Sequence, residues 1–212
     1  MLAAFAPMAT DMYLPALHLI AQDFHASQSA AESSVSLFFL GLALGQALYG
    51  PLADRWGRRA PLLLGIGLYA GATLACLLVS DITQLVALRV LQAMGGAAGM
   101  IVGRAIITDL YSERESARAF SLLMMVMTIA PIVAPVLGGF IITTLGWRAV
   151  FWVMLVFGLV AGVLVWRFIP ETLAPGQRSR EGLASTARGW LALLADPAFR
   201  TPALVGGLGQ GC

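Results

Sequence analysis

The sequence predicts an all-α polytopic membrane protein. Of its 212 residues, 59% are hydrophobic and only 11% are charged, whereas a soluble domain carries about 25% charged residues. The mean hydropathy is +0.84. Apolar stretches of about 20 residues, the length that crosses a bilayer as a helix, recur along the chain. This composition excludes a soluble globular domain, a disordered tail and a nucleic-acid binder.

Six stretches are long and apolar enough to be transmembrane helices. In chain order they are 2–22, 33–53, 60–80, 82–103, 119–147 and 149–166, and only the first and fourth contain a charge. A further apolar run from Thr201 to Cys212 is too short to cross. We therefore expect a six-helix transmembrane bundle over 1–169, an inter-bundle loop over 170–200 and the start of a truncated seventh helix over 201–212.

The arginines predict the orientation. The connections at 54–59, 109–118 and 167–200 carry ten arginines, and the opposite side carries only Arg148. Because cytoplasmic loops are enriched in basic residues, we expect the N-terminus and the long loop to be cytoplasmic. Apolar residues over 183–194 recur at helical spacing, which fits either a helix lying in the membrane interface or a short packed cytoplasmic helix.

Asp11 lies near the middle of the first stretch, where a charge is costly and usually functional. Pro7 and Pro15 each remove a backbone N–H from the same stretch, which loosens the helix. Loosened helices are tolerated where they line a polar cavity. We interpret Asp11 as a residue that could load and release a proton. The alternative is a structural aspartate satisfied by a neighbouring helix.

Arg89 lies inside the fourth stretch and needs a counter-charge, polar contacts or water. Asp11 is the only acid at comparable depth, so we expect the two to interact, directly or through water. The alternative is that Arg89 snorkels to the outer surface, as we expect of Arg104 near the cytoplasmic end.

Small residues predict where helix backbones approach closely. Gly95, Gly99 and Gly103 repeat at four-residue spacing in the fourth stretch. The pair Gly41 and Gly45 carries less weight, because a chain with 23 glycines contains such pairs by chance.

The connection between the second and third stretches combines a carboxylate, a glycine turn and three arginines. We name it the charged hinge; its residues of interest are Gly50, Asp54, Arg55, Gly57, Arg58 and Arg59. The orientation rule explains the arginines but not the spacing of Asp54 and Gly57. We therefore expect a tight turn with its own role on the cytoplasmic face.

The fifth stretch contains two prolines four residues apart among small residues: Ala130, Pro131, Ala134, Pro135, Gly138 and Gly139. Such a pattern predicts a helix that bends and packs closely against a neighbour. A merely kinked helix fits the same residues.

Together these motifs resemble the major facilitator superfamily. The charged hinge is similar to the signature of its loop between helices two and three. Leu88-Arg89-x-x-Gln92-x-x-Gly95 resembles its fourth-helix motif. Ala134-Pro135-x-x-Gly138-Gly139 resembles its fifth-helix antiporter motif, with Ala130 and Ala134 where glycine is usual. The segments Asp11–Pro15 and Pro170–Leu173 are similar to drug:proton antiporters of the bicyclomycin/chloramphenicol-resistance branch.

The resemblance implies the N-terminal half of a twelve-helix exporter in the bacterial inner membrane. A second six-helix bundle, missing from this chain, would complete a central cavity. Proton entry would drive the exit of small hydrophobic or cationic drug-like substrates by alternating access, with protons as the coupling ion and no cofactor or metal. The resemblance places Asp11, Tyr13, Arg89 and Gln92 in proton coupling and substrate binding, and the charged hinge in gating.

Other functions remain open from the residues alone. The chain could belong to a transporter of another solute, such as an amino acid, a sugar or a siderophore, or be a truncated product without function. An intramembrane enzyme is disfavoured, because the only histidines, His18 and His25, form no metal-ligand or nucleophile–base spacing. Cys76 and Cys212 indicate neither a disulfide framework nor a metal site.

Overall fold

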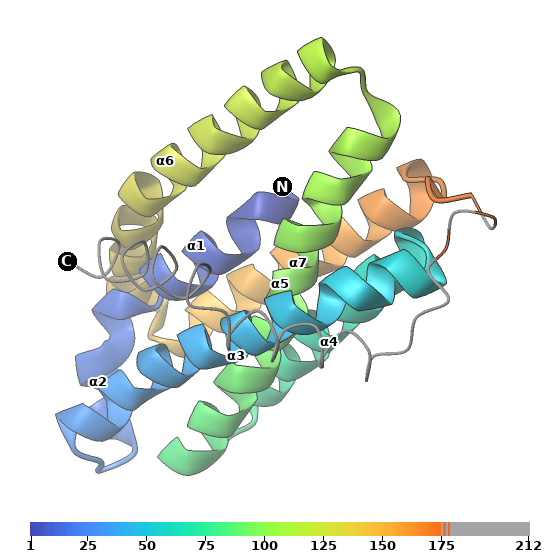
Figure 1. The fold of residues 1–212 in the computed structure, drawn as a ribbon. Helices are drawn as coiled ribbons and strands as arrows, with labels where there is room; N and C mark the ends of the chain where they lie inside the picture. Colours follow the sequence, from blue (N-terminus) through green and yellow to red (C-terminus); the bar gives the residue numbers. More distant parts are fainter. Residues whose placement is uncertain (175, 177, 179–212) are drawn as a thin grey trace, which may run out of the picture. The chain divides into compact units, whose positions relative to one another are not determined.

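The computed structural model describes residues 1–174, 176 and 178. All regular structure in this part of the chain is helical (Figure 1), which confirms the predicted fold class. The predicted helix at 183–194, interfacial or cytoplasmic, and the start of a seventh helix at 201–212 lie outside the described residues.

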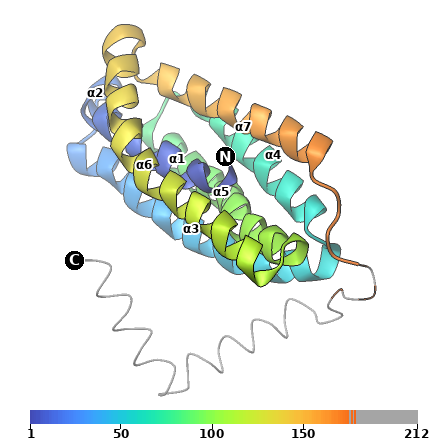
Figure 2. The ribbon, with the colours of Figure 1, turned by 90° about the horizontal axis from the view of Figure 1, so that it is seen from above.

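Five helices in the described part are long and apolar enough to cross a membrane. They are α3 (Gln28–Trp56), α4 (Arg59–Leu77), α5 (Ile82–Leu110), α6 (Glu113–Leu145) and α7 (Arg148–Phe168). Each coincides with one of the apolar stretches, and Figure 2 shows α3, α4, α5 and α7 as neighbours in one bundle. The chain is therefore a multi-pass membrane protein.

Polar side chains fix where several of these helices begin. The Ser27 hydroxyl accepts a hydrogen bond from the Ala30 N–H at the start of α3, and the Asp81 carboxylate accepts one from Thr83 at the start of α5. Ser112 and Glu115 form a capping box at the start of α6. Such caps satisfy backbone N–H groups that have no partner inside the helix. They explain why α3 and α6 begin several residues before their uncharged stretches.

The first apolar stretch is a broken helix, which we call the N-terminal span. It consists of η1 (Leu2–Ala4), α1 (Phe5–Asp11), η2 (Leu14–Ala16) and α2 (Leu17–Asp23). At the break the Tyr13 N–H donates to the Thr10 carbonyl at 3.1 Å, one residue short of the α-helical acceptor Ala9. Pro15 has no N–H to restore the helical pattern. The loosening expected from the prolines therefore takes the form of a short 3-10 turn just after Asp11.

Close backbone contacts hold α5 against its neighbours. α5 packs most extensively on α3 and α4, and α7 packs on α4. A Cβ atom added at Gly45 would lie 2.7 Å from the Ala97 Cβ and 2.7 Å from the Met94 carbonyl oxygen. Gly41 meets the backbone of Val90 just as closely. The low weight given to Gly41 and Gly45 was therefore wrong: this pair forms the contact between α3 and α5.

The glycine triple of α5 serves two neighbours rather than one. Gly95 packs against the backbone of α4 at Tyr69, and Gly99 packs against the carbonyl of Leu2. Gly103 makes only ordinary contact with the Leu2 side chain. The regular spacing thus produces close approach at two of its three positions.

α6 stands apart from the other helices of the described bundle. Its buried residues are Ser116, Ala134, Gly138 and Ile142, and its main neighbour is the N-terminal span (Figure 1). It continues as one helix through Pro131 and Pro135. Gly138 lies directly on the carbonyl of Met12, at the break of the N-terminal span.

We predict that Gly45→Ala destabilises the bundle, because the new methyl group meets backbone that cannot move aside. Overpacking of this kind costs about 1–3 kcal/mol, which a lowered midpoint of thermal unfolding in detergent would detect. Gly67→Ala is the matched control, since nothing lies within 4 Å of a Cβ added there. Equal unfolding midpoints for the two variants would contradict this account of the α3–α5 contact.

Candidate functional site

Arg89 is buried at the centre of the described bundle. Its side chain is 0% exposed, so the alternative of snorkelling to the surface is wrong. Its guanidinium donates to the Gln92 Oε1 at 2.6 Å and to the Ala9 carbonyl at 2.8 Å. The Cζ atom also lies 4.2 Å from the ring centre of Tyr13 and 4.3 Å from that of Phe38. Two hydrogen bonds and two aromatic faces thus compensate the buried charge.

The break in the N-terminal span supplies one of these acceptors. In an unbroken helix the Ala9 carbonyl would accept the N–H of Tyr13, but that N–H donates to Thr10 instead. Arg89 takes the vacated acceptor. The position of the guanidinium and the shape of the N-terminal span therefore depend on each other.

Hydrogen bonds extend from the residues around Arg89 into two further helices. Gln92 donates from its Nε2 to the Thr73 hydroxyl on α4 at 2.7 Å. The Tyr13 hydroxyl, beside Arg89, shares a hydrogen bond of 2.8 Å with Ser34 on α3. Both Tyr13 and Gln92 are fully buried. These two predicted site residues therefore surround Arg89 and do not reach the surface of the described bundle.

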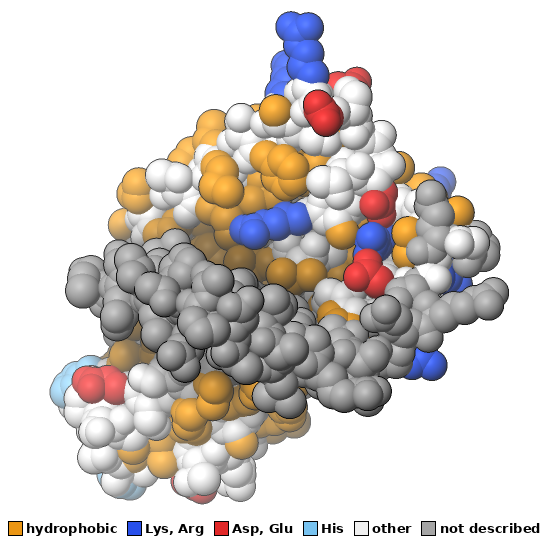
Figure 3. All heavy atoms as spheres, in the orientation of Figure 1, with side chains coloured by type: hydrophobic (Ala, Val, Ile, Leu, Met, Phe, Trp, Pro, Cys, Tyr) orange, Lys and Arg blue, Asp and Glu red, His pale blue; other side chains and the backbone are white. Residues whose placement is uncertain are grey.

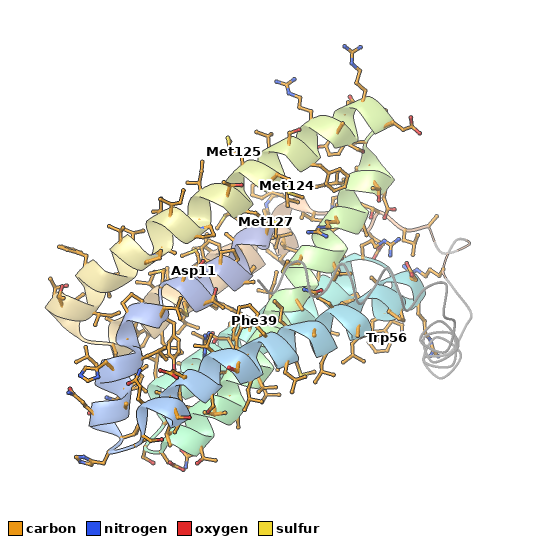
Figure 4. The ribbon with its side chains drawn as sticks, turned by 60° about the vertical axis from the view of Figure 1, so that its left-hand side comes forward. Asp11, Phe39, Trp56, Met124, Met125 and Met127 are labelled. Carbon is orange, nitrogen blue, oxygen red and sulfur yellow. The ribbon has the colours of Figure 1, made fainter. Side chains whose placement is uncertain are left out.

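Asp11 is partly exposed and lies at the last residue of α1, directly before the break. Figure 4 shows it on the N-terminal span, with α6 on one side and α3 on the other. The Thr10 hydroxyl donates to its Oδ1 at 3.2 Å. Among the described residues it forms no ion pair with Arg89, so the expected direct contact is wrong. A contact through water stays a prediction.

The physical reason is that Arg89 finds its partners elsewhere. A backbone carbonyl and an amide side chain accept hydrogen bonds from its two terminal nitrogens, and two aromatic rings face its charge. Arg104, by contrast, is exposed as expected.

At one end of the bundle, Arg58 of the charged hinge joins two helices. Its Nη1 donates to the Asp54 Oδ1 on α3 at 2.5 Å, and its Nε donates to the Asp109 Oδ2 near the end of α5 at 2.9 Å. The chain turns at Gly57, whose φ of +91° lies in the region that favours glycine. The spacing of Asp54, Gly57 and Arg58 thus has a structural purpose: one guanidinium bridges the ends of α3 and α5.

Glu171 completes the charged hinge, although the sequence did not predict this role. Its carboxylate accepts the backbone N–H of Arg58 at 2.8 Å and that of Arg59 at 3.3 Å. It thereby caps α4, which has no side-chain cap from its own N-cap residue. A Cβ added at Gly57 would collide with this carboxylate, so a larger residue there would have to displace the Glu171 side chain.

Further contacts tie the end of α7 to the charged hinge and the segment after α7 to the end of α5. The Arg59 side chain donates to the Trp166 carbonyl at 2.6 Å, and the Thr172 hydroxyl donates to the Asp109 carboxylate at 3.0 Å. Burial alone would raise the pKa of Glu171, but N–H donors at Arg58, Leu173 and Arg59 hold it below its usual range. Gly50 and Arg55, the other predicted members, make no such contact in the described part.

The fifth-helix motif meets the break of the N-terminal span. Ala134 is buried, and Gly138 packs on the Met12 carbonyl. Ala130 is partly buried, Pro131 is exposed, Pro135 is partly buried and Gly139 has open space around it. Alanine in place of the usual glycine at 130 and 134 therefore leaves one close contact, at Gly138.

These features define a class of protein. A buried cation holds a helix break, a partly exposed acid lies at the same break, and a charged hinge ties three helix ends together, all within a bundle of membrane-spanning helices. This arrangement is that of a helical membrane transporter. The chain belongs to the Major Facilitator Superfamily, whose profile matches residues 1–212. It is a transporter-family protein rather than an enzyme.

Relatives confirm the resemblance. The chain is 38% identical to the "Uncharacterized MFS-type transporter YdgK" of Bacillus subtilis, over 100% of this chain and 53% of the relative. It is 34% identical to the "Bicyclomycin resistance protein homolog" of Haemophilus influenzae, over 91% and 48%. It is 36% identical to the "Multidrug resistance protein D" of Escherichia coli, over 81% and 44%. The chain thus spans about half the length of the curated relatives it matches.

A solved structure supports the fold. A bacterial homolog of the human lysosomal transporter Spinster, in an inward-facing and unoccupied conformation, matches with a TM-score of 0.70 at 19% identity. The match covers 92% of this chain and 46% of that chain.

We predict that Glu171→Gln loosens the cap of α4, because a neutral amide accepts the Arg58 and Arg59 N–H groups more weakly than a carboxylate. The loss of such a cap is worth about 1 kcal/mol, or roughly fivefold faster hydrogen exchange at these two amides. The control is Glu113→Gln, an exposed acid on α6. Unchanged exchange at Arg58 and Arg59 would contradict the capping role.

The lowered pKa of Glu171 also predicts how the cap of α4 changes with pH. Its cap is fully present above the ordinary pKa of a glutamate, about 4.3, and is lost as the pH falls through the lower folded-state value. Spin labels at Ala60 and Ala174 should therefore separate only in acid. In Glu171→Gln their distance should not depend on pH in that range, and a wild-type separation near neutral pH would contradict the prediction.

Proposed function

We propose that this chain is the N-terminal half of a proton-coupled exporter of small hydrophobic or cationic drug-like molecules in the bacterial inner membrane. The observation that carries the proposal is Asp11: a partly exposed acid at a helix break whose Ala9 carbonyl is held by a buried arginine. The bicyclomycin- and multidrug-resistance names of two relatives support the substrate class.

A single carboxylate can couple two fluxes because it holds either a proton or a cation. Ionised Asp11 attracts a cationic or hydrogen-bond-donating drug, and protonated Asp11 releases it. Arg89 cannot lose its charge under physiological conditions, so it acts as a fixed element that holds the break beside Asp11. Alternating access requires a second bundle that rocks against this one around the shared site.

The charged hinge is the proposed gate. We expect it on the cytoplasmic side, because the connections on that side are rich in arginine. There α3, α5 and the segment after α7 converge on Arg58 and Glu171. Such a network stabilises one conformational state and must open in the other.

We predict that Asp11→Asn abolishes uphill export in a transporter that carries this half together with a second bundle. Asparagine mimics the permanently protonated acid, so proton-driven export should fall at least about tenfold, most for cationic drugs, while Asp11→Glu keeps part of it. Proteoliposomes with an imposed proton gradient provide the measurement.

Asp23→Asn is the control, because Asp23 lies at the end of the same span and pairs with Arg148. It should leave the pH dependence of export unchanged. Uphill export by Asp11→Asn with the wild-type pH dependence would overturn the role of Asp11. Uphill movement of a sugar or an amino acid, but of no drug, would overturn the substrate class.

We predict that Asp54→Asn reduces transport several-fold without preventing membrane insertion. The substitution removes the ionic partner of Arg58 on α3 and leaves Asp109 as its only carboxylate. Glu32→Gln, at the other end of α3, is the control and should transport normally. Normal transport by Asp54→Asn, measured at equal protein amounts, would contradict the gating role. The charges of the hinge would then reflect only the orientation of the chain in the membrane.

A further inference from the structure

An apolar groove runs between the N-terminal span and α6. Its volume is about 280 Å³; we call it the α1/α6 groove. Its lining residues are Ala4, Met8, Met12, Met125, Val126, Ile129, Ala130, Val133, Ala134 and Leu137. Figure 3 shows hydrophobic side chains covering α6 and continuing into the hollow below it. α6 packs along the N-terminal span and meets its backbone directly at Gly138, and the groove lies between the two.

Methionines line both walls of this groove, and their side chains differ in how freely they can change rotamer. Met12 is 1% exposed and its backbone supports Gly138, so it is fixed. Met8 is half-buried and Met125 is 52% exposed. A methionine that only fills a core is buried, as Met154 is. Unbranched, polarisable methionine side chains that are free to change rotamer are typical of surfaces that bind partners of several shapes.

Asp11 does not line the groove, but it lies between two residues that do, Met8 and Met12. It follows Met8 by three residues, so both lie on the same side of α1. Figure 4 shows Asp11 on the same side of the bundle as the labelled methionines of α6. Small-molecule pockets commonly measure about 300–1,000 Å³, so the groove has room for one ring system or alkyl arm. An apolar slot with a single carboxylate at its edge is complementary to a lipophilic cation.

We propose that the α1/α6 groove holds the apolar body of a lipophilic cation while Asp11 takes its charge, and that Met8 and Met125 set the range of shapes the site accepts. This inference rests on the proposed export function and assigns its specificity to two named side chains. A lipid acyl chain in the groove is the competing occupant.

Methionine methyl groups offer a direct test. The whole chain, labelled with ¹³C in its methionine methyl groups and placed in lipid nanodiscs, is titrated with tetraphenylphosphonium, and each signal is assigned with a Met→Leu variant. The Met8 and Met125 signals should shift. Those of Met124, equally exposed at 53% but outside the groove, and of buried Met154 should not. Equal shifts at Met124 would overturn the proposal, and full shifts in Asp11→Asn would overturn the role of Asp11. No shift would overturn the proposal in favour of the acyl-chain occupant.

A pair of variants tests whether Met8 and Met125 set the range of cation shapes that the groove accepts. Leucine matches methionine in volume but is branched and stiffer, so the double variant Met8→Leu, Met125→Leu should bind bulky ethidium about tenfold more weakly. A compact cation, tetraethylammonium, should stay within about twofold. Met124→Leu is the matched control and should bind both as the wild type does. An equal change for both cations would overturn the role of the methionines.

The same binding assay separates this inference from the proposed function, because it needs no proton gradient. Binding that follows the methionines in a protein that never exports uphill would overturn the proposed function alone. Proton-driven export with binding indifferent to Met8 and Met125 would overturn this inference alone.

Discussion

The cost of holding a guanidinium inside a membrane shapes the centre of this bundle. A charge at that depth persists only where protein groups replace water, and the groups around Arg89 come from three directions. The N-terminal span supplies a backbone carbonyl, α5 supplies Gln92, and Tyr13 and Phe38 supply aromatic faces. The carbonyl of Ala9 is free only because the helix breaks. The close glycine contacts of α5 with α3 and α4 bring the remaining partners within reach.

α5 connects the two polar regions of the described chain. It carries Arg89 in its first third and Asp109 near its end, so the helix that grips the broken span also anchors Arg58 of the charged hinge. A change of shape at the break would therefore move a helix that both regions share. Helices packed through backbone contacts shift as rigid bodies, because their interfaces have few side-chain atoms that can yield.

The sequence predicted the features that depend on local chemistry. Long apolar stretches predicted the helices, and the prolines around Asp11 predicted the break. Gly57, flanked by charged residues, predicted the turn. Prediction from the sequence failed where a charged side chain has backbone groups or aromatic rings as its partners. The expected contact between Arg89 and Asp11 considered only charged partners. In the structure Arg89 instead contacts a backbone carbonyl and two aromatic rings. The capping role of Glu171 was hidden because its partners are N–H groups, which leave no mark in a sequence.

The cap of α4 also constrains the order in which the chain can be assembled. Glu171 and the Arg58 N–H that it accepts are separated by 113 positions. A ribosome releases residue 58 long before residue 171, so the beginning of α4 waits, uncapped, while three more helices are synthesised. The charged hinge can reach its final geometry only when the last of these helices has been released. Its formation therefore reports that the whole six-helix half has been made and put together.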